Sequence, residues 1–307
     1  MFVTDYTMHL LDNVKKIHFI GCGGSGMYPL IQILSAKGYD ISGSDVLDGS
    51  IIRSEREMGV KVSLGHAADN VIGSDLVVYS AAIAKDNVEL NAAASYGIPT
   101  VERSVLLGYV SRLYKDSICV SGTHGKTTTT SMITTALELA GRDPSAVIGG
   151  KLPLIGGYGK AGSGQSVVIE ACEYHETFLH LTCAVGVILN IDNDHLEYYG
   201  TMGKLKLAFQ KFALLSRTVV FNMDDKNTMD VVNSIDRPVL SFGIEEEARF
   251  RAVNIGEYKP GFFEFDVLEL GEHFAHIKLG VPGYHNIYNA SVQVPNSISS
   301  PFFTDCS

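Results

Sequence analysis

The amino-acid sequence predicts an α/β protein, in which a doubly wound parallel sheet is followed by a second α/β sheet with an antiparallel extension. Three observations lead to this fold class. Apolar strand patterns alternate with helical patterns over residues 1–116, as they do in parallel sheets with crossover helices. A turn rich in glycine and threonine at 122–128 joins another strand pattern to a helical pattern. Three strand patterns then follow one another over 249–281.

The size and composition of the chain narrow the class of protein. Its 307 residues suggest about two domains, and the apolar content of 46% is enough for well-filled cores. The formal net charge of −10 predicts no nucleic-acid partner. The five cysteines are scattered without a Cys-x-x-Cys pair, which indicates neither a disulfide framework nor a zinc site. Because no signal peptide or long apolar run is visible, we expect a cytoplasmic chain with no membrane insertion.

The first segment that suggests a ligand is a glycine-rich turn near the N-terminus. Lys16–Ile20 has the pattern of a buried strand, and Gly21–Gly26 after it fits Gly-x-Gly-x-x-Gly. A helical face begins at Met27, and a second strand pattern, Tyr39–Ser44, ends at Asp45. This is a Rossmann-like βαβ unit with an acidic residue where such units contact a ribose. The turn alone is compatible with NAD or with another nucleotide's diphosphate, and close helix–strand packing also explains its glycines.

The turn at 122–128 is a stronger indication of a nucleotide. Ile118–Val120 is a short apolar strand pattern, and Gly122 and Gly125 allow a tight turn whose amides point inward. The helix that follows begins at the same turn, which is a phosphate-binding arrangement. Lys126 adds a charge for the outer phosphates, and Thr127 offers a hydroxyl to phosphate-bound Mg²⁺. The alternative is ordinary capping of a threonine-rich helix, which the coincidence of glycine, lysine and threonine disfavours.

The α/β pattern continues beyond this turn. Glycine-rich stretches at 149–150 and 156–164 are expected to be loops, and a helix is expected to begin near Asn286. Further strands are predicted at 60–63, 75–80, 166–170, 184–190, 218–222 and 239–242. The predicted domains are a Rossmann-like domain, a central P-loop ATP-binding domain and an unpacked tail, at residues 1–116, 117–294 and 295–307.

Two polar residues near strand ends are candidates for a metal site. Glu170 ends one predicted strand and His195 lies just past another, and open α/β sheets bind ligands at the carboxyl ends of their strands. Carboxylate is the expected ligand for Mg²⁺, whereas histidine is less usual. From spacing alone, an exposed strand-end carboxylate and a turn-capping histidine are equally good explanations. His175 and His180 are expected to be surface or packing residues.

Several segments together resemble one family. Gly122-Thr-His-Gly-Lys-Thr127, preceded by Val120 where the usual P-loop pattern has its first glycine, resembles the turn of the Mur ligases. These are ATP-dependent enzymes that add amino acids to cell-wall precursors. The resemblance covers about residues 14–292. The other segments that carry it are Gly21-Cys-Gly-Gly-Ser-Gly-Met27, Ser80-Ala-Ala-Ile83, Glu170-Ala-Cys-Glu173, Asn190-Ile-Asp-Asn-Asp-His195 and Gly283-Tyr-His-Asn286.

The resemblance implies ATP and Mg²⁺ as cofactors, and UDP-N-acetylmuramate and L-alanine as substrates. It also implies that the muramate carboxylate attacks the γ-phosphate to give an acyl phosphate and ADP, and that the amine of alanine then attacks the acyl carbon and phosphate leaves. The residues implied to bind the uridine nucleotide are Gly21, Gly23, Gly24, Ser25, Gly26, Asp45 and Ser80. Those implied to bind ATP are Gly122, Thr123, His124, Gly125, Lys126, Thr127 and Thr128, with His285, Asn286 and Asn289 near its base and ribose. The implied metal ligands are Thr127, Glu170 and His195, and the implied catalytic residues are Lys126, His124, Glu170 and His195.

The sequence also departs from this family. Tyr158 stands where an asparagine is expected, and Cys172, Tyr174 and His175 stand where many relatives carry acidic or small polar residues. The family's third, C-terminal domain is expected to be absent from this chain, so the chain alone is expected to ligate alanine negligibly. Two other function classes stay open. One is a non-catalytic nucleotide-binding remnant, and the other is a dinucleotide-dependent oxidoreductase, which the P-loop disfavours.

Overall fold

The computed structural model describes residues 9–245 and 247–293. The predicted division into domains at 116/117 stays a prediction, and the predicted tail lies outside the described residues. The chain separates into two compact units, the first formed by residues 1–113 with 144–164 and the second by residues 114–143 with 165–307.

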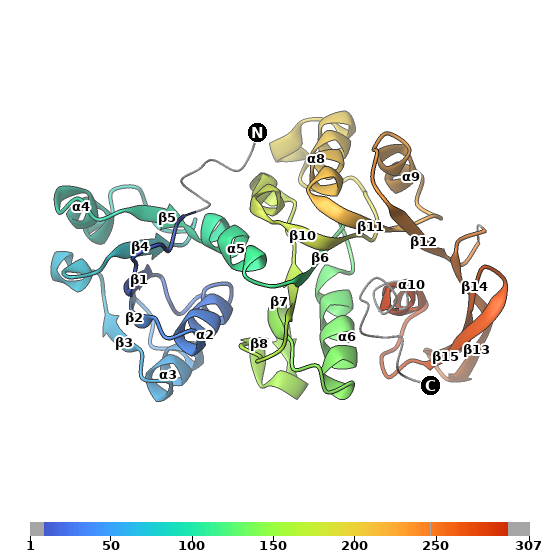
Figure 1. Ribbon diagram of the computed structural model, residues 1–307, viewed down its shortest axis with the longest axis horizontal. Coiled ribbons are helices and arrows are strands. Elements are labelled where there is room, and N and C mark those ends of the chain that lie inside the picture. Colours follow the sequence, from blue (N-terminus) through green and yellow to red (C-terminus); the bar gives the residue numbers. More distant parts are fainter. Residues whose placement is uncertain (1–8, 246, 294–307) are drawn as a thin grey trace. The chain divides into compact units, whose positions relative to one another are not determined.

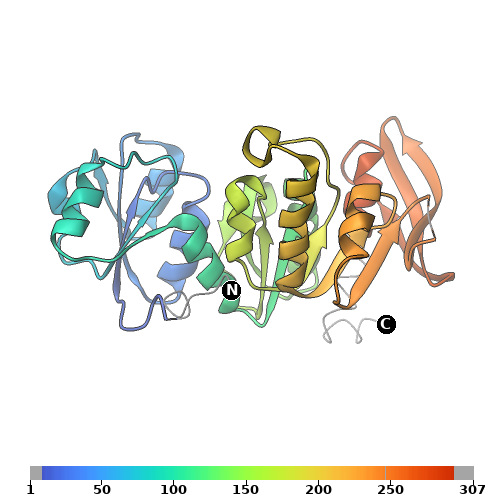
Figure 2. The same ribbon diagram turned by 90° about the horizontal axis from the view of Figure 1, so that it is seen from above.

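The first unit contains a parallel five-stranded sheet with the order β3-β2-β1-β4-β5. The chain moves outward from β1 in both directions, which confirms the predicted doubly wound sheet. Right-handed crossovers place α2 and α3 on one face and α4 on the other, and Figure 2 shows helices on both sides of the sheet. The elements are β1 Lys16–Ile20, α2 Tyr28–Ala36, β2 Asp40–Asp45, α3 Ser50–Glu57, β3 Lys61–Leu64, β4 Leu76–Tyr79, α4 Val88–Ser95, β5 Thr100–Glu102, α5 Arg103–Arg112, β7 Ser145–Leu152 and β8 Gly157–Lys160.

Local sequence explains where the helices of this unit begin and end. Pro29 lies in the first turn of α2, where its missing N–H costs no helical hydrogen bond. Asn87 is the N-cap of α4, and its side chain accepts hydrogen bonds from the amides of Glu89 and Leu90. Gly97, with a φ of 69°, follows the same helix and allows the chain to turn. These short connections bring the loops after β1, β2 and β4 to one edge of the sheet.

The glycine-rich stretches at 149–150 and 156–164 are not simply loops, so that prediction was wrong. Residues 149–150 lie inside β7 and most of β8 lies in the second stretch; the two strands form an antiparallel hairpin that contacts α2. A Cβ on Gly159 would lie 2.6 Å from the Cγ atom of Pro29. This glycine is therefore required by the close approach of a helix to a strand and not by a turn.

The second unit carries strands in the order β15-β14-β13-β12-β11-β10-β6-β9. Pairing is parallel from β9 to β13. It is antiparallel between β13, β14 and β15, which confirms the predicted extension. The elements are β6 Asp116–Ser121, α6 Lys126–Leu139, β9 Ser166–Glu170, β10 Cys183–Ile188, α7 Leu196–Tyr199, α8 Met202–Leu214, β11 Ser216–Asn222, α9 Lys226–Val232, β12 Val239–Gly243, β13 Phe250–Lys259, β14 Phe262–Glu269, β15 Glu272–Lys278 and α10 His285–Ser291.

Helices cover both faces of this second sheet. α6 and α10 lie on one face, and α8 and α9 lie on the other (Figure 1). The core between the sheet, α6 and α10 includes Val120, Phe242, Phe265 and Ile287, all fully buried. Each such side chain contributes about 1.5–3 kcal/mol when removed from water. Because β6 is flanked by β9 and β10, the loop that follows it emerges beside two other strand ends.

Candidate nucleotide sites

The glycine turn of the first unit is fixed by hydrogen bonds to the end of β2. The Gly21 amide donates to the Ser44 carbonyl at 2.8 Å, and the Gly23 amide donates to Oδ2 of Asp45 at 3.0 Å. Gly21 has a φ of 79°, a conformation that favours glycine. Gly24-Ser25 is exposed. The structure thus places Asp45 directly against the turn that the sequence singled out.

Other side chains around this turn explain its small residues. A Cβ on Gly21 would lie 3.3 Å from Cδ1 of Ile83 and 3.7 Å from Cβ of Ser80, so Ser80 is adjacent to the turn. A Cβ on Gly26 would lie 3.3 Å from a guanidinium nitrogen of Arg103, the first residue of α5. A cation beside an exposed turn suits an anionic diphosphate. No sequence pattern pointed to Arg103.

A buried carboxylate supports the strand that holds this turn. Glu89 is fully buried, and its carboxylate accepts hydrogen bonds from Ser44 Oγ at 2.6 Å and Asn70 Nδ2 at 2.5 Å. Burial by itself raises the pKa of Glu89. The stabilisation of the carboxylate by His18, Ser44 and Asn70 outweighs burial and lowers the pKa to about 2.

A second buried carboxyl group has the opposite behaviour. Glu55 on α3 is fully buried close to Cys22 of the glycine turn. Burial raises the pKa of Glu55 to about 7, with Cys22 partly opposing this shift and Asp45 adding to it. The first unit therefore contains one buried carboxyl group that favours ionisation and one that resists it.

In the second unit, residues 122–125 connect β6 to the N-terminus of α6, as predicted. Gly122 has a φ of 142° and Gly125 a φ of 84°, and both values favour glycine. A Cβ on Gly122 would lie 2.9 Å from Cβ of Leu189. The sequence places glycine where the backbone must turn against the end of β10.

Asn190, just after β10, fixes this loop from outside. Its Oδ1 accepts a hydrogen bond from the His124 amide at 2.8 Å, and its Nδ2 donates to the His124 carbonyl at 3.1 Å. Its own carbonyl accepts from the Thr123 amide at 3.0 Å. The His124 side chain is exposed, with Nε2 3.7 Å from Oδ2 of Asp192. The loop is therefore held by its backbone, and His124 extends outward.

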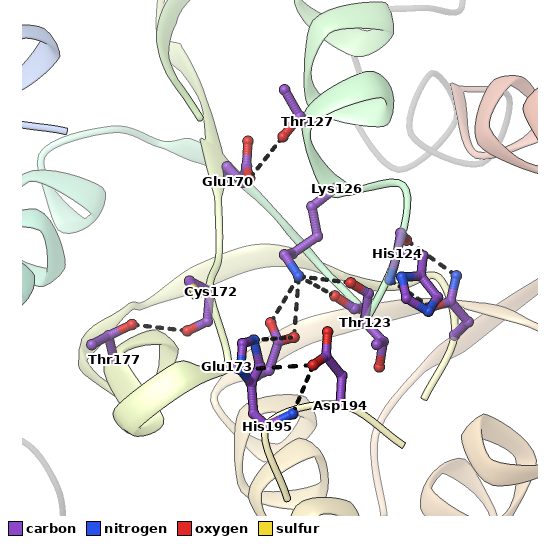
Figure 3. A network of polar contacts seen from close by, with 12 residues as sticks. Thr123, His124, Lys126, Thr127, Glu170, Cys172, Glu173, Thr177, Asp194 and His195 are labelled. Carbon is purple, nitrogen blue, oxygen red and sulfur yellow. Dashed lines mark hydrogen bonds and ion pairs between the residues drawn. The ribbon is translucent and has the colours of Figure 1, made fainter. Parts of the chain in front are cut away.

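Lys126 turns back onto the loop and does not point outward. Its Nζ donates to the carbonyl oxygens of Gly122 at 2.6 Å and Thr123 at 3.0 Å. The same nitrogen lies 3.1 Å from Oε1 and 3.0 Å from Oε2 of Glu173. Figure 3 shows the lysine directed toward Glu173. The charge that the sequence assigned to outer phosphates is thus paired within the protein.

Thr127 and Glu170 meet as a pair of oxygen donors. The Thr127 hydroxyl donates to Oε1 of Glu170 at 2.9 Å (Figure 3). A hydroxyl and a carboxylate in contact fit Mg²⁺, which takes oxygen ligands and usually one or two carboxylates together with phosphates and waters. Over residues 9–245 and 247–293, no three or more His, Cys, Asp and Glu side chains are grouped to hold a metal by themselves. The donor set therefore fits a metal that shares its coordination with a phosphate.

His195 lies beside Glu173. Its Nε2 is 3.9 Å from Oε1 of Glu173, and its ring centroid is 4.7 Å from that of Tyr174. His195 has a φ of 54°, which is uncommon for a non-glycine residue. His175, a further departure from the family pattern, packs its ring 4.6 Å from Tyr198 in the same aromatic cluster. His195 thus contacts Glu173 and Tyr174, whereas Thr127 contacts Glu170.

The predicted base and ribose residues lie on α10. Asn286 and Asn289 are buried, and Nδ2 of Asn289 donates to Oδ1 of Asn286 at 2.8 Å. A Cβ on Gly125 would lie 2.5 Å from Oδ1 of Asn289. His285 is exposed. In this structure Asn289 lies against the loop, Asn286 accepts a hydrogen bond from Asn289, and His285 is the exposed member of the set.

Three residues at these sites were missed as candidates. Glu173 lies inside the Glu170-Ala-Cys-Glu173 segment, but only the first glutamate ends the strand. Asn190 had a possible signal, because it is a polar residue directly after an apolar strand. Arg103 approaches the glycine turn from a helix far along the chain.

Comparisons with known proteins match both units. The family model described as "Mur ligase family, catalytic domain" matches residues 16–115, and the "Mur ligase middle domain" matches residues 120–294. The UDP-N-acetylmuramate–L-alanine ligase of Caldanaerobacter subterraneus subsp. tengcongensis is 42% identical over 283 residues, which are 91% of this chain and 62% of that protein. The enzyme of the same name from Acetivibrio thermocellus is also 42% identical, over 91% of this chain and 61% of that protein.

Solved structures give the same picture. A UDP-N-acetylmuramate–alanine ligase from Thermotoga maritima matches with a TM-score of 0.79 and 29% identity, over 93% of this chain and 66% of that one. A UDP-N-acetylmuramate:L-alanyl-γ-D-glutamyl-meso-diaminopimelate ligase from Neisseria meningitides matches with a TM-score of 0.81 and 26% identity, over 93% of this chain and 94% of that one. This chain spans 62% of the length of the first of these relatives. In the part of the chain that the structure describes, no helix is both long and apolar enough to cross a membrane.

Proposed function

This chain belongs to the Mur ligase family, and we propose its function from that membership. The function is the ATP-dependent joining of L-alanine to UDP-N-acetylmuramate, in the cytoplasm, during synthesis of the cell-wall precursor. The observation that carries it is the second-unit loop, where Gly122 and Gly125 turn the chain into α6 and Thr127 contacts Glu170. Such a loop supplies amides and a hydroxyl to a nucleoside triphosphate.

The identity of the amino acid rests on the relatives. Those named for L-alanine are 42% identical, whereas the structure named for a tripeptide ligase is 26% identical. We therefore favour L-alanine over a peptide as the second substrate. The glycine turn, with Asp45, Ser80 and Arg103 beside it, is proposed to bind the uridine diphosphate. This assignment replaces a dinucleotide, because the family match covers both units.

In this proposal each group near the loop has a defined task. The amides of the first turn of α6 bind the triphosphate, and Lys126 neutralises charge that develops on the transferred phosphoryl oxygens. Thr127 and Glu170 would hold Mg²⁺, with His195 proposed as a further ligand; the metal supplies positive charge at the phosphates when bound. Orientation of the muramate carboxylate toward the γ-phosphate then favours its attack, which releases ADP and forms the acyl phosphate, and the amine of alanine displaces phosphate from that intermediate.

Binding measurements on Lys126→Ala test the nucleotide site. We expect Mg·ATP binding, measured by calorimetry, to be lost in this variant, whereas UDP-N-acetylmuramate binding is kept because the glycine turn is in the other unit. Lys206→Ala is the matched control, since that lysine of α8 is also paired, with Asp230 at 2.6 Å, but is not part of the loop. Equal ATP affinity in Lys126→Ala and the parent chain would refute the assignment.

A further inference from the structure

The ammonium group of Lys126 has all its contacts within the protein. An ammonium carries three N–H donors. Two point at the carbonyl oxygens of Gly122 and Thr123, and the third faces the carboxylate of Glu173. Because no donor is left over, a phosphate can be contacted only if at least one of these partners is given up.

The carboxylate of Glu173 sits on a backbone that hydrogen bonds hold in place. The side chain is 2% exposed. The Glu173 carbonyl accepts hydrogen bonds from the Glu176 amide at 2.9 Å and from the buried Tyr199 hydroxyl. The Lys126 side chain has four methylene groups and that of Glu173 has two, so Lys126 has the longer reach when the pair separates.

The pair is close but incompletely hydrogen bonded. Oε1 of Glu173 accepts from Lys126, whereas buried Oε2, although 3.0 Å from the same nitrogen, accepts no hydrogen bond from any residue that the structure describes. A buried acceptor left in this state reduces the net stability of an ion pair. The His195 ring, with Nε2 3.9 Å from Oε1, is the next polar group beside the carboxylate. Glu173 therefore stays next to a polar side chain if Lys126 leaves.

We propose that Glu173 is a positioning residue that holds Lys126 on the loop carbonyls in the nucleotide-free site. The phosphate oxygens of the nucleotide then compete with Glu173 for the ammonium. This inference rests on the proposed function, because it requires the loop to bind ATP. In this proposal Glu173 lowers the affinity for the nucleotide, because part of the binding energy is used to separate Lys126 from the carboxylate.

The test is calorimetric titration of the 307-residue chain with ATP in EDTA, so that metal coordination does not contribute. We expect Glu173→Gln to bind ATP about tenfold more tightly than the parent, which corresponds to about 1.4 kcal/mol and lies within the coupling of residues in contact. Glu173→Asp, which keeps the charge, should bind as the parent does. Glu176→Gln is the control, since it removes a carboxylate three residues away that pairs with Lys211.

A double-mutant cycle separates this mechanism from general charge repulsion. In the Lys126→Ala background, Glu173→Gln should leave the residual ATP affinity unchanged, since the partner through which it acts is missing. A tenfold gain that persists there, or that also occurs in Glu176→Gln, would overturn the proposal. Unchanged or weaker ATP binding by Glu173→Gln would overturn it as well.

A readout without nucleotide completes the design. In the free chain, the Lys126 ammonium protons should exchange slowly and give an ¹⁵N-detected signal, which should disappear in Glu173→Gln. If that signal is the same in both, the proposal fails even where affinities differ. If the parent chain binds no ATP even when Mg²⁺ is present, the proposed function fails first, which is distinct from a parent that binds ATP without a gain in the variant.

Discussion

A single methyl group added at Gly125 is predicted to destabilise the loop between β6 and α6 in two ways. Alanine there must adopt a φ of 84°, which costs about 1–2 kcal/mol. Its Cβ would also lie 2.5 Å from Oδ1 of Asn289. Moving Asn289 breaks its buried hydrogen bond to Asn286, at about 1–3 kcal/mol. We therefore expect Gly125→Ala to lower the free energy of unfolding by about 3 kcal/mol.

Gly141, at the other end of α6, provides the matched comparison. It has a φ of 69°, but a Cβ at this position would meet no described heavy atom within 4 Å, so Gly141→Ala should cost only the backbone term of about 1–2 kcal/mol. Urea unfolding followed by far-UV circular dichroism measures both variants, since the chain has no tryptophan. Each loss is read from the shift of the midpoint at constant slope.

The comparison isolates the contact with Asn289. If the two alanine variants lose equal stability, Asn289 does not restrict the size of the side chain at position 125. A further arm is Gly125→Ala combined with Asn289→Ala, which should lose less than the sum of the two single variants because the smaller residue makes room. Additive losses would contradict the close contact.

Two buried carboxyl groups of the first unit give opposite pH dependences. The lowered pKa of Glu89, about 2 against 4.5, stabilises the fold by about 3 kcal/mol above pH 4.5, and this contribution is lost as the pH falls through about 2. Glu89→Gln should therefore be destabilised by about that amount at pH 7 and show less change between pH 5 and 2. The raised pKa of Glu55, about 7, makes the fold lose stability as the pH rises from 4.5 to 7, because the unfolded chain ionises first. Glu55→Gln should match the parent near pH 4 and exceed it at pH 8 by about 3 kcal/mol in urea titrations; a constant difference across the range would contradict the buried, neutral carboxyl group.

Much of the fold could be predicted because it depends on local periodicity. The strand patterns and the turn residues alone indicated both sheets and the antiparallel extension. The β7–β8 hairpin could not be found this way, because Gly159 is fixed by contact with Pro29, more than a hundred residues earlier. In a single sequence, a glycine required by such packing looks the same as a glycine required by a turn.

The residues of the candidate sites also fall into those that a local sequence pattern predicts and those that depend on long-range contacts. Lys126 and Thr127 stand in a contiguous pattern, and their helix begins where the pattern predicts. Glu173 could be recognised only through its contact with Lys126, which joins segments 47 positions apart. Arg103 depends on the approach of α5 to the glycine turn. A role that depends on two side chains meeting across the fold produces no pattern of spacing in the sequence, so it cannot be predicted from the sequence.

The hairpin has a consequence for how the protein can be divided. The chain leaves the first unit after residue 113, returns to it at 144 and leaves again after 164. A gene cut once between the units would therefore deprive α2 of the hairpin that packs against it, and expose Pro29 and its apolar neighbours. A fusion or fragment design that keeps the first unit intact needs residues 144–164 supplied as well, for example by circular permutation or by a linker from residue 113 to 144.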